Sequence, residues 1–273
     1  MQKNKKLAYI LVMLLMFISC SEYQKVLNKG TVEDQYKMAV KMYESQKYSK
    51  ALRLFEKITP SYRGKPQMER IQFMVSQANF NVKNYSLAGY YFDRFAKNYP
   101  KSSKVEEAAF LSALSYYKAA PRFSLDPTDT NKALEAFQGF IDKFPDSDRL
   151  AEANKYYGEL RYKLEKKAFE IAKTYYRTAD YDPRNYKAAI VAFDNLLSDY
   201  LGTSFKEEAL YYRLKAAHDF AMKSTFRRKG ERIEEAIKAY EKLQRNFPQS
   251  KYKEDSDKML SALQKEQEQL VKS

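Results

Sequence analysis

The stretch that decides the fold is residues 84–117, NYSLAGYYFDRFAKNYPKSSKVEEAAFLSALSYY. In it Phe92 follows Ala88 after four residues, Pro100 comes eight residues later, and Ala108 a further eight. Alanine lets two antiparallel helices approach closely, the ring one turn later fills the gap beside it, and proline cannot continue a helix. The succession of alanine, aromatic residue, proline and second alanine therefore predicts a helix that ends at the proline and a second helix that follows it.

The same register recurs along the chain. The alanine-aromatic pairs are Ala51 with Phe55, Ala88 with Phe92, Ala133 with Phe137, Ala189 with Phe193, and Ala236 with Tyr240. The residues eight beyond the last four aromatics are Pro100, Pro145, Leu201 and Pro248, and the serines that follow are Ser102, Ser147, Ser204 and Ser250. We expect these serines to cap the next helix. Repetition at this regularity predicts a stack of helical hairpins.

Two insertions lengthen the repeats. Residues 119–130, AAPRFSLDPTDT, predict a loop that ends in a helix cap. Apolar residues recur at spacings of three and four at Tyr157, Leu160, Leu164, Ala168, Ile171 and Tyr175. They predict one long helix from about Leu150 to Thr178, with apolar surface that its own hairpin does not cover.

Composition agrees with an all-α fold. The 273 residues include only 7 Gly and 8 Pro, no Trp, and 24 Tyr with 17 Phe, which suits helices packed through aromatic side chains. The hairpins resemble the tetratricopeptide repeat over nearly all of residues 33–260. This resemblance implies a right-handed superhelical solenoid of about five tetratricopeptide-like hairpins.

The first 20 residues, MQKNKKLAYILVMLLMFISC, have the layout of an export signal. Three lysines precede an apolar run that is too short to span a bilayer. Cys20 directly after this run resembles the lipobox of bacterial lipoproteins, although Phe17 replaces the usual leucine. We expect residues 1–19 to be a signal peptide, Cys20 to carry the lipid, and residues 20–32 to be a tether. Ser21 gives no inner-membrane retention signal, so the expected place is the periplasmic face of the outer membrane.

The chain is strongly basic. Its formal charge is +14, and loss of the three lysines in residues 1–19, which hold no acid, leaves +11. An exported lipoprotein rarely meets nucleic acid, so we expect no nucleic-acid partner. Anionic lipid headgroups or an acidic protein surface fit this charge better.

The lipoprotein signal, the degenerate repeats and residues 84–117 together resemble the BamD family of outer-membrane β-barrel assembly lipoproteins. The resemblance implies a scaffold with two kinds of partner, namely unfolded outer-membrane protein clients and the periplasmic domains of the barrel assembly protein. We expect the client groove in repeats 33–148 and partner docking in repeats 149–273; the resemblance likewise implies that repeats near the carboxyl end meet the barrel assembly protein. Two alternatives stay open: an exported repeat scaffold that coordinates cell-envelope constriction or peptidoglycan processes, and a glycan-capture lipoprotein.

Alignment with the repeat predicts the residues of the groove, because the first helix of each tetratricopeptide hairpin lines the concave face. They are Tyr36, Val40, Tyr43, Phe73, Gln77, Phe80 and Asn81. Rings supply contact area and an amide can pair with a peptide backbone, which suits an extended peptide ending in an aromatic residue. Tyr43 and Phe80 could equally pack between helices.

A second candidate surface is the run STFRRKGER near the turn of the last hairpin, which predicts a short basic loop. Its charged residues are Arg227, Arg228, Lys229 and Arg232. Arginine is favoured at protein contacts because its planar fork can bind carboxylates and stack on rings. A solvated basic turn is the alternative.

Catalytic chemistry is not indicated. Cys20 is the only cysteine and His218 the only histidine, and a lone histidine on a helix is most often structural. We find no glycine-rich phosphate loop, no metal-ligand spacing and no nucleophile-base pair, so we expect no enzyme, metal or cofactor. The acidic pairs Glu106–Glu107 and Glu207–Glu208 open predicted helices, where they complement the helix dipole.

Overall fold

A computed structural model describes residues 22–272, and within that range the chain forms only helices and their connections. Residues 22–29 form a helical segment. The helices that follow are α2 (Val32–Glu44), α3 (Tyr48–Ile58), the 3-10 helix η1 (Thr59–Tyr62), α4 (Gln67–Asn81), α5 (Tyr85–Asn98), α6 (Val105–Ala119), α7 (Thr128–Lys143), α8 (Leu150–Thr178), α9 (Arg184–Asp199), α10 (Lys206–Met222), α11 (Phe226–Asn246) and α12 (Lys253–Lys272). The all-α class is confirmed.

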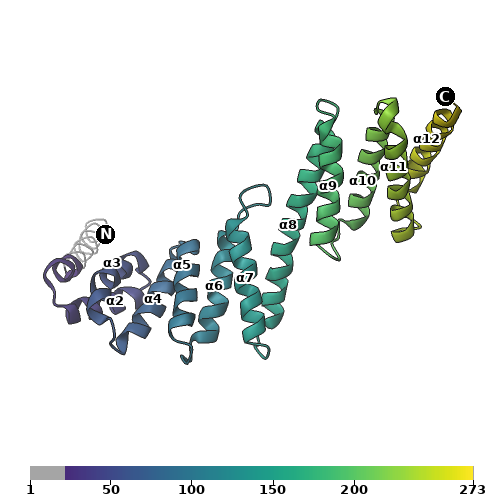
Figure 1. Ribbon diagram of the computed structural model, residues 1–273. Coiled ribbons are helices and arrows are strands. Elements are labelled where there is room, and N and C mark those ends of the chain that lie inside the picture. The colour runs from purple at the N-terminus through teal and green to yellow at the C-terminus, as the bar shows by residue number, and fades with distance from the viewer. Residues whose placement is uncertain (1–21, 273) are drawn as a thin grey trace, which may run out of the picture. The chain divides into compact units, whose positions relative to one another are not determined.

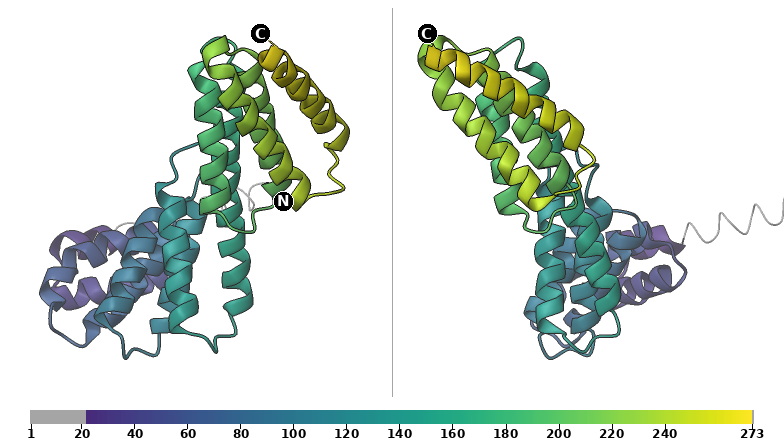
Figure 2. Two further views of the ribbon diagram at one scale, coloured as in Figure 1. Left: turned by 45° about the vertical axis from the view of Figure 1, so that its right-hand side comes forward. Right: turned by 90° about the vertical axis from the view of Figure 1, so that its right-hand side faces the viewer.

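The described chain folds as two compact units. The first contains residues up to 121 and 127–157, and the second contains 122–126 and the residues from 158 onward. Within each unit, successive helices lie side by side as hairpins (Figure 1). Helices α9 to α12 of the second unit, green to yellow, stay adjacent in both views of Figure 2. The predicted stacking of helical hairpins is therefore present in both units.

The alanine-aromatic pairs pack as expected. In the first four pairs both residues are fully buried. In the second, third and fourth pairs the ring also meets a ring from the helix before it, with centroids 5.9 Å apart for Phe92 and Phe73, and 5.9 Å apart for Phe193 and Phe169. Truncating such a buried ring to alanine costs about 3–5 kcal/mol. The fifth copy differs, because Tyr240 is half-buried and its hydroxyl donates to Asp257 Oδ1 at 2.7 Å.

The hydroxyl residues after the repeat ends do not cap the next helix, contrary to the sequence prediction. Each hydroxyl oxygen accepts a hydrogen bond from the backbone N–H two residues later in the turn. For example, the Lys104 N–H donates to Ser102 Oγ at 3.1 Å. Helix α6 begins only at Val105, and no side chain caps it. In the fourth copy Thr203, rather than the predicted Ser204, takes this position. The hydroxyl thus fixes the connection instead of the helix terminus.

Three of these hydroxyls also tie neighbouring hairpins together. The bonds run from Ser147 Oγ to Glu106 Oε1 at 2.6 Å, from Thr203 Oγ1 to Glu165 Oε2 at 2.9 Å, and from Ser250 Oγ to Glu207 Oε1 at 2.8 Å. Charge-assisted bonds of this kind are stronger than neutral ones. Glu106 and Glu207 therefore do more than complement a helix dipole, which is the only role that the sequence indicated.

The insertions are partly as predicted. Helix α8 runs from Leu150 to Thr178, as its apolar periodicity predicted. The connection before α7 is a loop, but Pro127 stands at the N-cap and offers no side-chain cap. The prediction of a basic loop was wrong: α11 begins at Phe226, so all four basic residues of the run are helical. Arginine and lysine are good helix formers, and they extend this helix toward its N-terminus.

Candidate functional site

The first helices of two successive hairpins, α2 and α4, border a cavity of about 500 Å³ in the first unit. Tyr43, Phe73 and Gln77 all line it, as the repeat alignment predicted. The Tyr43 hydroxyl donates to Gln77 Oε1, which joins the two helices. Because the amide oxygen is engaged and no described residue accepts from Gln77 Nε2, that nitrogen can donate to a bound carbonyl. We call this cavity the α2–α4 groove.

The other four predicted groove residues lie elsewhere. Tyr36 and Val40 pack against the first hydrophobic core, with the Tyr36 ring 5.4 Å from that of Tyr62. Phe80 packs edge-on against Tyr85, with ring centroids 5.5 Å apart. Asn81 Nδ2 donates to the backbone oxygen of Gln77 at 2.8 Å, as an exposed residue at the helix end. The structure therefore brings three of the seven predicted residues into one cavity.

Charged residues that the sequence reasoning missed complete the groove. Glu44, Glu69, Arg70 and Lys104 line it. Arg70 Nη2 lies 4.0 Å from Glu44 Oε1, and both side chains are largely exposed. Lys104 Nζ stands 5.6 Å from the centre of the Phe73 ring. The groove is thus lined by both charge signs around an apolar floor, which suits a peptide backbone better than a single ion.

Burial raises the pKa of the Tyr43 hydroxyl above its ordinary value, with a smaller contribution from Tyr48 nearby. The hydroxyl therefore stays protonated at every physiological pH and remains a donor to Gln77. This fixed donor holds the Gln77 amide in one orientation. An amide held in this way is ready to bind without first being ordered.

The basic residues of the second unit separate into two groups. Lys229 Nζ bonds Glu266 Oε2 at 2.8 Å with both side chains largely buried, and the Arg232 guanidinium lies 3.6 Å from the centre of the Phe220 ring. These two contacts hold α11 against its neighbours. Arg228 makes only an exposed contact with Glu231 at 3.3 Å, and Arg227 is exposed without an ion pair to any described residue. Of the four predicted docking residues, only Arg227 and Arg228 are therefore available to a partner.

Helices α8 and α9 leave apolar surface uncovered in the second unit. Tyr175 of α8 is 40 % exposed and Val191 of α9 is 48 % exposed. Both line one open hollow with Arg184, Lys187 and neighbouring small residues. The long helix does carry uncovered apolar side chains, as its stripe predicted, and Val191 extends that surface onto the next helix. Exposed patches of this kind often mark contact surfaces.

Residues 22–272 offer no cluster of histidine, cysteine or acidic side chains that could hold a metal ion. No helix in that range is long and apolar enough to cross a membrane. His218 Nδ1 lies 2.8 Å from Asp219 Oδ1, and Asp219 also accepts from the Tyr176 hydroxyl at 2.7 Å. The histidine thus belongs to a network that joins α8 and α10. Cys20, the predicted lipid site, lies outside the described residues.

Known proteins match most of this chain. The YfiO family, described as outer membrane lipoprotein, matches residues 28–231, and a tetratricopeptide repeat matches residues 224–250. The outer membrane protein assembly factor BamD of Rickettsia prowazekii is 25% identical over 232 residues, which cover 82% of this chain and 90% of that protein. The BamD of Haemophilus influenzae is 24% identical, covering 64% of this chain and 70% of its own. That of Caulobacter vibrioides is 21% identical, covering 86% and 72%.

The family match begins ahead of α2 and extends into α11, so it takes in the α2–α4 groove, the long helix and the basic run up to residue 231. It agrees with the family that residues 84–117 indicated. The chain belongs to the YfiO (BamD) family of outer membrane lipoproteins.

Proposed function

We propose that this chain is a scaffold for the assembly of outer membrane proteins. A lipid on Cys20 holds it at the periplasmic face of the outer membrane. The α2–α4 groove binds segments of unfolded barrel clients, and the second unit docks on the periplasmic domains of the barrel assembly protein. The name shared by the relatives, outer membrane protein assembly factor, supports the overall role.

The observation that carries the client-binding part is the pairing of Tyr43 with Gln77 beside Phe73. A strand-like peptide offers backbone carbonyls and alternating side chains. The fixed amide of Gln77 can pair with the backbone, and the Phe73 ring can contact an aromatic side chain. Nothing in the groove supplies a nucleophile with a base, so binding rather than chemistry is what these residues can perform.

The direct test measures binding of a synthetic peptide that copies the aromatic carboxyl terminus of a barrel protein. Gln77→Ala should weaken binding about two- to thirteenfold, the effect of one hydrogen bond of roughly 0.5–1.5 kcal/mol. Asn81→Ala is the matched control, because it removes the same amide one turn later on α4 and outside the groove. Equal losses in the two variants, with helicity intact, would rule out the groove.

The assembly role is separated from the two alternatives by what accompanies the protein in the envelope. The native lipoprotein would be purified from membranes in mild detergent and its companions identified by mass spectrometry. Recovery of a large β-barrel protein would support the proposal. Recovery of peptidoglycan or division proteins alone would favour a scaffold for envelope constriction, and retention on glycan resin would favour glycan capture.

A further inference from the structure

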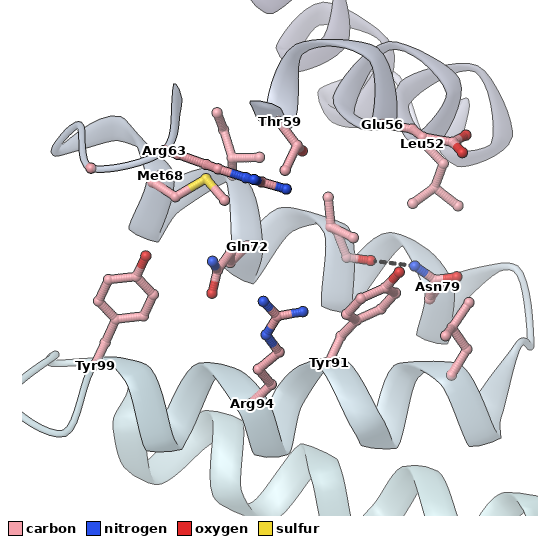
Figure 3. Close-up of a pocket in the computed structure, with 14 residues that line it drawn as sticks. Leu52, Glu56, Thr59, Arg63, Met68, Gln72, Asn79, Tyr91, Arg94 and Tyr99 are labelled. Atoms are coloured by element: carbon pink, nitrogen blue, oxygen red, sulfur yellow. Dashed lines mark hydrogen bonds between the residues drawn. The ribbon is translucent and has the colours of Figure 1, made fainter. Parts of the chain in front are cut away.

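A second cavity of about 610 Å³ lies on another face of α4, between α3 and α5 (Figure 3). From α4 it takes Met68, Gln72, Val75 and Asn79, which recur at helical spacing. These residues are not among those that line the α2–α4 groove. The α3–α5 cavity is therefore a separate feature, and neither the repeat alignment nor the proposed function uses it.

Two arginines converge in this cavity. Arg63 reaches in from the connection after η1 and Arg94 from α5, and Figure 3 shows both guanidinium groups directed into the middle of the cavity near Gln72. Neither arginine forms an ion pair with another described residue. Glu56 lines the same cavity but lies at its far end in the view. Two like charges that no carboxylate of the described residues pairs with create a positive potential that an anionic group would relieve.

The walls around the arginines are apolar and aromatic. Tyr91 and Tyr99 flank Arg94 in Figure 3, and Leu52 lies near Glu56. Leu87 also lines the cavity. Leu87 is 43 % exposed, which is high for a large aliphatic side chain beside a cavity. A small inorganic anion would neutralise the arginines and leave these walls in water. A ligand that fits the whole cavity must carry both an anionic group and apolar groups.

We propose that the α3–α5 cavity binds an extended acidic segment of a protein partner. The carboxylate of an Asp or Glu side chain lies between Arg63 and Arg94, and the apolar side chains next to it in the segment contact Leu52 and Leu87. Arginine suits this role because its planar fork pairs with a carboxylate through two parallel hydrogen bonds. The cavity size falls in the range of about 300–1,000 Å³ that small ligand sites occupy, enough for a few residues of an extended chain.

The test uses a fluorescein-labelled, amide-capped peptide of alternating leucine and aspartate, with binding followed by anisotropy at physiological salt. One matched probe replaces each aspartate by asparagine, and another is the asparagine peptide with a free terminal carboxylate. The variant is Arg63→Gln with Arg94→Gln. Its control is Arg53→Gln with Arg122→Gln, which removes the same charge from positions that do not line the cavity.

We expect the aspartate peptide to bind, and the asparagine peptide and the Arg63/Arg94 variant each to lower its affinity at least about tenfold. The Arg53/Arg122 variant should bind like the parent. The proposal is overturned if the aspartate peptide fails to bind at about 1 mM, the weak limit of recognition, or if both double variants lose affinity equally. It is also overturned if the free-carboxylate probe binds as well as the aspartate peptide, or if only phosphatidylglycerol vesicles respond to loss of Arg63 and Arg94.

If this experiment fails, the proposal that the α2–α4 groove binds clients is unaffected. The Arg63/Arg94 variant changes no residue of the α2–α4 groove, so the barrel peptide should bind it normally. Circular dichroism of the same variant would confirm that an altered affinity does not come from unfolding.

Discussion

Replacing Gly89 with alanine should loosen the contact between α5 and α6. A Cβ atom built at Gly89 would lie 2.8 Å from two carbons of the Tyr116 ring on α6. At the same place Ser112 Oγ donates to the backbone oxygen of Gly89 at 2.8 Å. The two helices therefore approach as closely as glycine allows, and a methyl group must push the ring or the helix away.

Three contributions set the size of the effect. Alanine gains about 1 kcal/mol over glycine in helix propensity. Overpacking of a well-filled contact costs roughly 1–3 kcal/mol, and weakening of the Ser112 bond costs about 1 kcal/mol. The expected net result is a loss of about 1–3 kcal/mol in the free energy of unfolding of the first unit, or a factor of about 5–150 in its folded-to-unfolded ratio.

The assay is amide hydrogen exchange followed by mass spectrometry, because it reports on each unit separately. Peptides from α5 and α6 should exchange about 5- to 150-fold faster in Gly89→Ala, while peptides from α9 and α10 keep their rates. Gly139→Ala is the matched control, since a Cβ on that α7 glycine meets no atom within 4 Å. We expect it to stabilise the unit by up to about 1 kcal/mol.

Combination with Tyr116→Ala isolates the proposed clash. If the ring is the obstacle, Gly89→Ala should cost little in a chain that already lacks the ring. The coupling free energy of the double-mutant cycle should then equal most of the loss that Gly89→Ala causes alone. A coupling energy of zero, or slower exchange in Gly89→Ala than in Gly139→Ala, would refute the packing argument.

Three further predictions concern the anchor, the docking surface and alkaline pH. A Cys20→Ala chain should move from the membrane fraction to the periplasm, and continued resistance to carbonate washing, with partner binding excluded, would contradict lipid attachment. Reversing Arg227 and Arg228 to glutamate should weaken co-purification of the barrel assembly protein in a salt-sensitive way and leave peptide binding in the groove unchanged; survival of the complex at physiological salt would exclude this surface. Burial raises the pKa of Tyr116 from 10.0 to about 12, so its stabilising contribution is complete below pH 10 and is lost as pH rises toward 12, because the unfolded chain ionises first. Urea unfolding at pH 9 and 11 should show this loss, and Tyr116→Phe should reduce it.

Two local patterns in the sequence predicted local features correctly. The apolar stripe predicted both ends of α8, and the alanine-aromatic pairs predicted the buried contacts. Both predictions succeeded because each pattern depends on residues within a few helical turns. The basic run was misread because four closely spaced cations suggested a turn. In the structure Ile233 and Ala236 are buried on the inner face of α11, and the helix continues from them back to Phe226.

Contacts between hairpins could not be predicted from one sequence. The hydroxyl-to-glutamate bonds join residues 38 to 43 positions apart, and no local spacing marks such pairs. The same holds for Lys229, whose partner Glu266 stands 37 positions later on α12. The four basic residues of the run could not be distinguished as docking residues in the sequence, yet two of them make contacts within the protein.

The open surfaces of the first unit depend on a segment that the repeat pattern does not contain. The 3-10 helix η1 follows α3, and its Tyr62 packs on Tyr36, which removes Tyr36 from the predicted groove. The connection after η1 places Arg63 in the α3–α5 cavity and turns at Gly64, whose φ of +75° favours glycine. The repeats thus supply the helices, whereas this short insertion decides which of their residues are covered and which remain available to a ligand. Aligning a chain with a repeat therefore predicts its contact helices more reliably than its contact residues.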